Sequence, residues 1–358
     1  MSSYLDLYGW NEYFAQQMTE KEKQTKIIGR VLEEQKGLVR IVCEKGEVWG
    51  KPAGKLFFEA SGKNDLPATG DWVICAFSDC EGQVLVERIL KRKTLLVRKA
   101  AGTRTAVQVL GANVDYVLIT TSVNHDLNER RIERYLILTW ESGAIPVILL
   151  NKTDLVSNPN EIEQRMTLAF PETTVLSVSA KNKIGLASIS KLVGVGKTAA
   201  LLGSSGVGKS TLINALLGKD EKPVQDIREW DDKGRHTTTY RELIPLPNGG
   251  VIMDSPGMRE LALWDSEEGI SRGFADIETL QLQCKFSNCT HETEPGCAVL
   301  AAIKNGTLDK KRLTAFQKLE RERFYTEQKQ NMSAAKVEKN RWKKIHIEQK
   351  RIKKLGIK

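Results

Sequence analysis

Residues 203–210 read GSSGVGKS, which has the G-x-x-x-x-G-K-S spacing of a phosphate-binding loop. An apolar run, residues 199–202, comes before the loop, and a helix-favouring stretch begins at Ser210. Such a loop needs a strand before it and a helix after it, because backbone N–H groups and the positive end of the helix hold the anion together. A chance glycine-rich turn would lack that setting. The sequence therefore predicts alternating strands and helices, with a nucleotide at the carboxyl ends of the strands.

Two side chains of this loop have specific predicted contacts. Lys209 should reach the β- and γ-phosphates, and the Ser210 hydroxyl should bind the Mg²⁺ that accompanies the nucleotide. The predicted phosphate-binding residues are Gly203, Ser204, Ser205, Gly206, Val207, Gly208, Lys209, Ser210 and Thr211.

The tetrapeptide Asn151-Lys152-Thr153-Asp154 follows the apolar run PVILL and predicts which base is bound. The Asp154 carboxylate can accept hydrogen bonds from guanine N1–H and the exocyclic amine. Adenine lacks that donor pair, and a buried acceptor left unpaired costs at least ~1–3 kcal/mol. Asn151 can tie neighbouring loops together, and the Lys152 stem can lie against the base.

A second short motif, Ser179-Ala180-Lys181, closes the apolar run TVLSVSA. Its small side chains and backbone N–H groups suit the guanine O6. Taken alone this motif is weak, but it adds Ser179 and Ala180 to the predicted GTP-binding residues.

A switch segment is predicted at residues 254–257, which read DSPG after the strand-like GGVIM. Asp254 can hold Mg²⁺ through water, and the Gly257 N–H can face the γ-phosphate. One threonine of residues 237–239 should complete the magnesium shell, with Thr238 marginally preferred. An idle polar loop is the alternative for that stretch.

Met258 occupies the position after the switch glycine, where a glutamine would orient the attacking water. A thioether cannot do so, and another group must position the water or hydrolysis is intrinsically slow. His236, in the segment KGRHTTTYRE, is the predicted catalytic residue. The alternative is an ordinary solvent-exposed loop histidine.

Three cysteines and one histidine crowd into fourteen residues: Cys284, Cys289, His291 and Cys297. Three thiolates and an imidazole suit one tetrahedral, structural Zn²⁺ and leave no position for a catalytic water. A cluster of reduced thiols without metal is the alternative.

The residue pattern changes along the chain and predicts several domains. A short polar helical arm is predicted for residues 1–25, followed over 26–100 by a β-barrel with strands at GLVRIVCE, GEVWGKP, GKLFFEA, DWVICAF and GQVLVERIL. An OB-fold is preferred and an SH3-like barrel is the alternative. Residues 101–263 should form the nucleotide domain, a doubly wound sheet. A helical zinc-binding domain is predicted over 264–326 and a basic tail over 327–358.

Positive charge is concentrated at the C-terminus. Residues 331–358 hold ten lysines and arginines against two glutamates, a net +8 of the chain's +9. A polyanion such as RNA is the favoured partner, and a solvated helix face is the alternative. No apolar run approaches the ~20 residues of a membrane helix, and the N-terminus lacks a secretory pattern. We expect a cytoplasmic monomer.

The motif order NKTD, SA, GSSGVGKS, GRHTTT, DSPG, between a barrel and a cysteine–histidine cluster, resembles the circularly permuted GTPases of the ribosome small-subunit-dependent (RsgA/YjeQ) family. The similarity covers roughly residues 26–320 and extends to NHDLNERRIERYLILTWESG and CTHETEPGCAV. Met258 departs from it, since a phenylalanine is expected there.

This resemblance implies an OB-fold barrel, a permuted GTPase domain and a zinc-binding domain. It further implies GTP hydrolysis to GDP, stimulated by the small ribosomal subunit during its late maturation, with rRNA binding and a catalytic role for His236. The alternatives are a permuted GTPase of large-subunit assembly, another RNA-associated nucleotide switch, a P-loop kinase or ATPase, and a nucleic-acid-binding module with a vestigial loop. The NKTD motif disfavours a kinase, and the intact Lys209, Ser210 and Asp254 disfavour a vestigial site.

Overall fold

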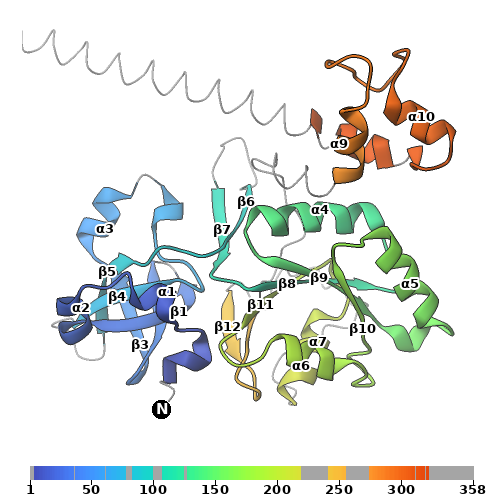
Figure 1. The fold of residues 1–358 in the computed structure, drawn as a ribbon. Coiled ribbons are helices and arrows are strands. Elements are labelled where there is room, and N and C mark those ends of the chain that lie inside the picture. The colour runs from blue at the N-terminus through green and yellow to red at the C-terminus, as the bar shows by residue number, and fades with distance from the viewer. Residues whose placement is uncertain are drawn as a thin grey trace, which may run out of the picture. The chain divides into compact units, whose positions relative to one another are not determined.

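The structure, a computed structural model, describes residues 4–35, 37–60, 62–77, 83–99, 107–124, 127–218, 241–254, 274–310, 312–318 and 320–321 (Figure 1). The chain separates into two compact units. The described residues up to 254 belong to the first unit, and those from 274 onward belong to the second. His236, Thr238, Gly257 and the basic tail lie outside the described residues.

Residues 4–25 contain three short helices and are not polar throughout. The elements are η1 (Tyr4–Tyr8), α1 (Glu12–Ala15) and α2 (Glu20–Thr25). Leu5, Tyr8 and Phe14 are buried. The rings of Trp10 and Phe14 lie 4.8 and 5.7 Å from the ring of Trp72, which belongs to the barrel. The arm is therefore packed against the barrel through aromatic contacts.

Five strands close into a barrel in the order β1-β2-β3-β5-β4, with β4 returning to pair with β1. The elements are β1 (Ile27–Gln35), β2 (Leu38–Cys43), β3 (Gly46–Pro52), α3 (Gly54–Glu59), η2 (Lys63–Asp65), β4 (Trp72–Phe77) and β5 (Gln83–Ile89). This is a five-stranded OB-type barrel. Its interior is filled by Val31, Val39, Ile41, Val73, Cys75, Val84 and Val86.

One predicted strand is wrong. The segment GKLFFEA forms helix α3. Leu56 is partly buried against the barrel core, whereas Phe57 and Phe58 are 51% and 92% exposed. A single inward-facing apolar position suits a short helix on the barrel better than the alternating burial of a strand.

A hairpin of β6 (Leu95–Lys99) and β7 (Val107–Ala112) leads from the barrel to the nucleotide domain. The elements that follow are β8 (Tyr116–Ser122), α4 (Glu129–Glu141), β9 (Ile145–Asn151), η3 (Thr153–Leu155), α5 (Pro159–Ala169), β10 (Thr174–Ser177), α6 (Leu186–Leu192), β11 (Thr198–Leu202), α7 (Lys209–Leu217), β12 (Glu242–Pro245) and β13 (Val251–Asp254).

The strands of this domain lie in the order β10-β9-β8-β11-β13-β12. The first five are parallel, and β12 is antiparallel to β13. Helix α4 covers one face of the sheet, and α6 and α7 cover the other (Figure 1). The sheet is therefore doubly wound, and its first parallel strands precede the strand of the phosphate loop, as the permuted motif order predicts.

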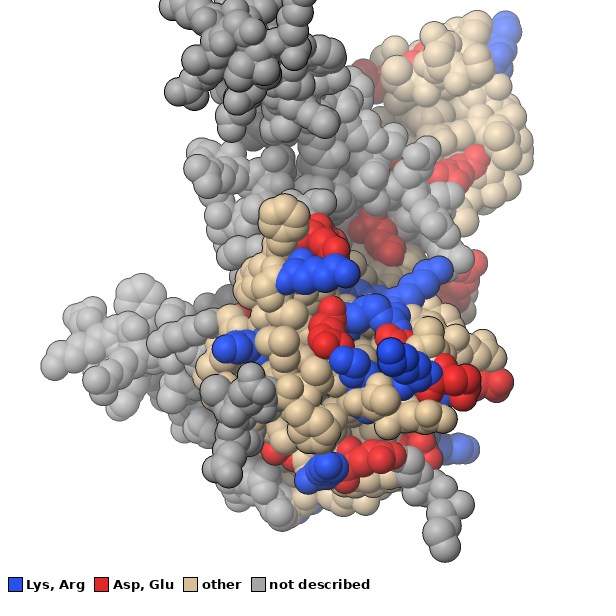
Figure 2. All heavy atoms as spheres, turned by 90° about the vertical axis from the view of Figure 1, so that its left-hand side faces the viewer, with Lys and Arg blue, Asp and Glu red and all other residues tan. Residues whose placement is uncertain are grey.

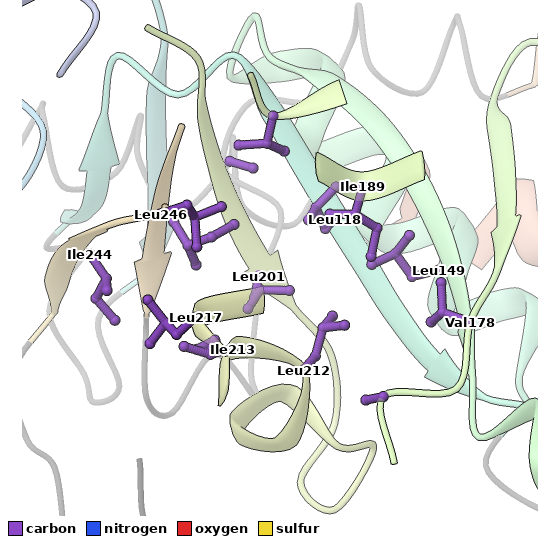
Figure 3. Packing of buried hydrophobic residues seen from close by; sticks show 14 of the residues in the cluster. Leu118, Leu149, Val178, Ile189, Leu201, Leu212, Ile213, Leu217, Ile244 and Leu246 are labelled. Carbon is purple, nitrogen blue, oxygen red and sulfur yellow. The ribbon is translucent and has the colours of Figure 1, made fainter. Parts of the chain in front are cut away.

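A hydrophobic core between the sheet and helices α6 and α7 holds these helices in place. Leu212 and Ile213 of α7 pack against Leu118 and Leu201 of the sheet, and Ile189 of α6 joins them (Figure 3). All five side chains are no more than 1% exposed. Helix α7 is thereby held directly beneath the strand that leads into the phosphate loop.

A buried arginine joins the arm, the barrel and the nucleotide sheet. Arg30 of β1 is 1% exposed and donates to the carbonyl oxygen of Tyr8 and to Thr198 Oγ1, the latter at 2.8 Å. It also donates to the carbonyl oxygens of Gly70 (3.2 Å) and Asn113 (2.8 Å). Burial lowers the pKa of Arg30 to about 10, so the guanidinium stays charged at neutral pH. Its oxygen partners offset the cost of burying that charge.

The second unit contains α9 (Ala275–Gln281) and α10 (Ala298–Lys304), and residues 312–318 are also helical. The ring centroids of Phe274 and Phe316 lie 5.4 Å apart in its small core. The cysteine–histidine cluster lies between α9 and α10 along the chain.

Candidate active site

The phosphate loop joins the end of β11 to the start of α7. Gly203, Gly206 and Gly208 have φ values of +154°, +79° and +95°, which L-residues with a side chain rarely adopt. A Cβ at Gly203 would lie 2.3 Å from the carbonyl oxygen of Thr120, two residues before the end of β8. The sequence does not predict a role for Thr120, because only its backbone carbonyl contacts the loop and any residue type has that group.

Lys209 is the first residue of α7, and its Nζ donates to the carbonyl oxygens of Gly203 and Ser204, both at 2.7 Å. The ammonium group is thus curled over its own loop. Ser210 and Thr211 follow in the first turn of the helix and are half-buried. The loop therefore presents a lysine, hydroxyls and the positive end of a nine-residue helix to one region of space.

Asn151 ends β9 and connects two other loops. Its Nδ2 donates to the carbonyl oxygen of Val207 at 2.8 Å, and its Oδ1 accepts from the Ala180 N–H at 3.1 Å. Asn151 is 1% exposed. A Cβ at Gly208 would lie 2.6 Å from Nδ2, so only glycine permits this approach. Three predicted motifs therefore meet at one buried amide.

The rest of the guanine motif is oriented by its neighbours. Lys152 has a left-handed φ of +64°, and its Nζ donates to the carbonyl oxygen of Gly206 at 2.6 Å. Asp154 is exposed, and its Oδ1 accepts from Ser179 Oγ at 2.5 Å. Ser179 is fully buried and its Oγ accepts from the Asn182 N–H at 3.1 Å. This arrangement leaves Asp154 a solvent-facing carboxylate held by a buried hydroxyl.

Asp254 lies at the same end of the sheet as the phosphate loop. Strand β13 runs parallel to β11, and Met253 of β13 pairs with Ala200 of β11. The strand ends at the half-buried Asp254, while Leu202 ends β11. A carboxylate is thus available one strand away from Gly203.

A separate cluster in the second unit could hold a metal ion. The ligand atoms of Cys284, Cys289, His291 and Cys297 all lie within 4.8 Å of one another. His291 Nδ1 is 3.3 Å from Cys297 Sγ and 3.7 Å from Cys284 Sγ. Burial lowers the pKa of His291, which favours the neutral imidazole that metal binding needs.

Local geometry supports this cluster. His291 has a left-handed φ of +58°, which turns the chain sharply between the second and fourth ligands. Cys297 caps α10, and its Sγ accepts from the Leu300 N–H at 3.4 Å. The donor set of three sulfurs and one nitrogen fits a closed tetrahedral site.

Among the described residues, no helix has both the length and the apolar character needed to cross a bilayer.

Known proteins resemble this chain over most of its length. A sequence model of the RsgA GTPase family matches residues 89–264. The small ribosomal subunit biogenesis GTPase RsgA 1 of Oceanobacillus iheyensis is 44% identical over 331 residues, which are 92% of this chain and 94% of that protein.

Two solved structures are also similar. YjeQ from Thermotoga maritima has a TM-score of 0.63 and 26% identity, covering 84% of this chain and 99% of its own. YloQ, described as a circularly permuted GTPase, has a TM-score of 0.60 over 86% of this chain and 98% of its own. Its identity of 22% makes that a likeness of fold alone.

Proposed function

The chain belongs to the RsgA GTPase family, and from that premise we propose that its GTP hydrolysis in small-ribosomal-subunit biogenesis takes place at the site around Asn151. The observation that carries the assignment is the pair of hydrogen bonds from Asn151 to Val207 and Ala180. They bring a base-reading motif and a phosphate-binding loop to one edge of the sheet, which is what a guanine nucleotide requires.

The base lies against Lys152, with Asp154 accepting from N1–H and the amine and with Ser179 and Ala180 beside O6. The hydrogen bond from Ser179 supports this role, because it fixes one carboxylate oxygen of Asp154. Thr153 is 8% exposed, and its N–H donates to the carbonyl oxygen of Val178 at 3.3 Å, which ties the motif to the segment after β10.

The phosphates lie in the loop from Gly203 to Thr211. Lys209, now bonded to loop carbonyls, turns to the β- and γ-phosphates, which are stronger acceptors. Ser210 and Thr238, with Asp254 acting through water, would hold the Mg²⁺ that accompanies GTP, and the ion would neutralise charge on the phosphates. The Gly257 N–H faces the γ-phosphate.

His236 orients the attacking water, because Met258 offers no hydrogen-bonding group at the usual position. The reaction cleaves the bond between the γ-phosphorus and the β–γ bridging oxygen. The water oxygen becomes part of the phosphate and GDP leaves, with the small subunit accelerating the step.

The metal of the second unit is zinc with a structural role. The four protein ligands leave no open position for substrate or water. Bound there, zinc stabilises the loop between Cys284 and Cys297 and the helices on either side.

The RNA-binding regions are the barrel, residues 26–100, and the basic tail, residues 327–358. On the face shown in Figure 2, basic and acidic side chains are interspersed. The barrel also holds the ion pairs Lys26–Glu87 and Arg40–Glu47. The tail thus supplies most of the unbalanced positive charge, and binding weakens as salt rises. The protein acts as a cytoplasmic monomer.

One measurement tests this function: GTP turnover with and without purified small ribosomal subunits, with large subunits and ATP as controls. We expect turnover of GTP but not ATP, stimulated by small subunits alone. Equal stimulation by large subunits would contradict the assignment of partner, and equal turnover of ATP would contradict the assignment of base.

A further inference from the structure

A row of paired residues crosses five neighbouring strands. Arg40 of β2 lies opposite Trp49 of β3 and opposite Glu33 of β1. Glu33 is in turn opposite Glu242 of β12, and Glu242 is opposite Asp254 of β13. Every one of these pairs is antiparallel, and directly opposed side chains share a face of the sheet. We call Trp49, Arg40, Glu33, Glu242 and Asp254 the cross-strand row.

The row joins the two halves of the first unit. Within the described residues, Glu33 and Glu242 are the pair through which β1 of the barrel meets β12 of the nucleotide sheet. Two like charges directly opposite each other destabilise a strand pair. The contact therefore needs a cation to persist.

Arg40 supplies that cation. Its Nη2 lies 2.6 Å from Glu242 Oε1, its Nη1 lies 2.8 Å from Glu47 Oε2 and its Nε lies 3.4 Å from Glu33 Oε2. The Arg40 side chain is only 22% exposed, and Glu33 only 12%, so solvent screens this cluster less than a surface pair. A planar guanidinium can serve several carboxylates at once, which an ammonium cannot.

A second contact holds the same point of the chain. Thr69 Oγ1, from the barrel, donates to the carbonyl oxygen of Arg241 at 3.3 Å. Arg241 and Glu242 are the first described residues after the segment that holds His236 and Thr238. The chain is therefore anchored to the barrel at Arg241, three residues beyond Thr238 and within roughly 11 Å of extended chain.

We propose that Arg40 is a positioning residue for GTP hydrolysis, coupling the barrel to the switch through the cross-strand row. The inference rests on the proposed function. Arg40 holds Glu242, which fixes the end of the segment bearing His236 and aligns Asp254 across the β12–β13 pair. Trp49, which is 38% exposed, ends the row on the barrel surface directly opposite Arg40. A partner seated on the barrel thus acts on the switch through β2, β1 and β12.

The test uses the full chain with Arg40→Gln, Glu242→Gln, the double variant and Arg40→Lys. The matched control is Arg88→Gln, because Arg88 is also a barrel arginine paired with a glutamate, Glu22 at 2.9 Å, but lies away from β12. For each variant, kcat with and without small subunits, the Kd for GDP and the melting temperature are measured.

We expect Arg40→Gln and Glu242→Gln each to lower the subunit-stimulated kcat about five- to tenfold, with the Kd for GDP changed less than about twofold. Such a factor corresponds to about 1–1.4 kcal/mol in the barrier. The double variant should be no worse than the worse single variant, since each single variant already breaks the Arg40–Glu242 ion pair. Arg40→Lys should recover part of the rate.

Stimulated turnover in Arg40→Gln equal to that of Arg88→Gln would overturn the inference, and so would a parallel loss of GDP affinity, which marks a merely structural role. If Arg40→Gln melts below the assay temperature, Glu242→Gln decides, because it leaves Arg40 paired with Glu33 and Glu47. A wild-type protein that small subunits do not stimulate would refute the proposed function itself, before any variant is compared.

Discussion

Asn151 Nδ2 donates a hydrogen bond to the carbonyl oxygen of Val207, 2.8 Å away, and so links the guanine motif to the phosphate loop across 56 positions of the chain. The same side chain accepts from the Ala180 N–H. Replacing Asn151 by alanine leaves two backbone groups unpaired in a buried place, at a cost of ~1–3 kcal/mol each.

Asn151→Ala should therefore weaken GTP and GDP binding by roughly 10- to 100-fold and lower the melting temperature. Equilibrium titration with a fluorescent guanine nucleotide measures the affinity. Asn160→Ala, an exposed asparagine in α5, is the control and should change neither quantity. Unaltered affinity in Asn151→Ala would remove the link between the two motifs from the binding site.

Asp154→Asn should change which base is bound. The amide cannot accept from both N1–H and the amine of guanine, so GTP affinity should fall by about 100-fold, as expected when a polar pairing is lost. Xanthine carries a carbonyl in place of the amine and can accept from the new amide, so xanthosine triphosphate should bind the variant better than GTP does. Competition binding with GTP, ATP and xanthosine triphosphate distinguishes this from general damage, which would weaken all three alike.

Gly203→Ala should abolish nucleotide binding, because the new Cβ would lie 2.3 Å from the Thr120 carbonyl oxygen and the residue has a φ of +154°. Gly37→Ala separates these two causes, since Gly37 has a φ of +84° with nothing within 4 Å of its Cβ. The control should lose about 1 kcal/mol of stability while keeping its nucleotide affinity. Comparable GTP affinity in both variants would show that the loop can shift to admit a methyl group.

His236→Ala should lower kcat about 100-fold or more while leaving the Kd for GTP nearly unchanged, because positioning of the attacking water acts on the transition state. Single-turnover hydrolysis and nucleotide titration separate the two quantities. His346→Ala, in the basic tail, is the control. Undiminished turnover in His236→Ala would assign the catalytic help to Mg²⁺ or to the ribosomal subunit alone.

Removal of zinc should loosen the second unit, because the free energy of metal binding is also folding free energy. Chelation, or Cys289→Ser, should make residues 274–321 sensitive to protease while leaving GDP affinity intact. Ser287→Ala, an exposed neighbour, serves as the control. Metal loss should be faster at lower pH, since protons compete for the thiolates. Full protease resistance after zinc removal would contradict the structural role.

Much of the site could be predicted from the sequence because its chemistry is local. Residues 203–210 carry their glycines, lysine and serine within one loop, and residues 151–154 carry the predicted base-recognition motif within four positions. The clustering of Cys284, Cys289, His291 and Cys297 is local too, and the structure places their ligand atoms together. Residue type and spacing are sufficient where a single turn of chain makes the contact.

Tertiary structure decided the features that depend on neighbouring strands. The meeting of Asn151 with Val207 and Ala180 requires β9, β10 and β11 to end at one edge of the sheet. Residues 54–59 form a helix and not the expected strand. Their apolar residues are compatible with either element, and the packing of Leu56 against the folded barrel favours the helix.

The permuted motif order, by itself, indicated a GTPase and predicts a switch after the phosphate loop. It carried no information on how the barrel joins the nucleotide sheet. The register of Glu33 against Glu242 and the burial of Arg30 arise from contacts between residues far apart in the chain. Such pairings are selected by the packing and charge balance of the whole folded unit, and no local pattern of residues encodes them.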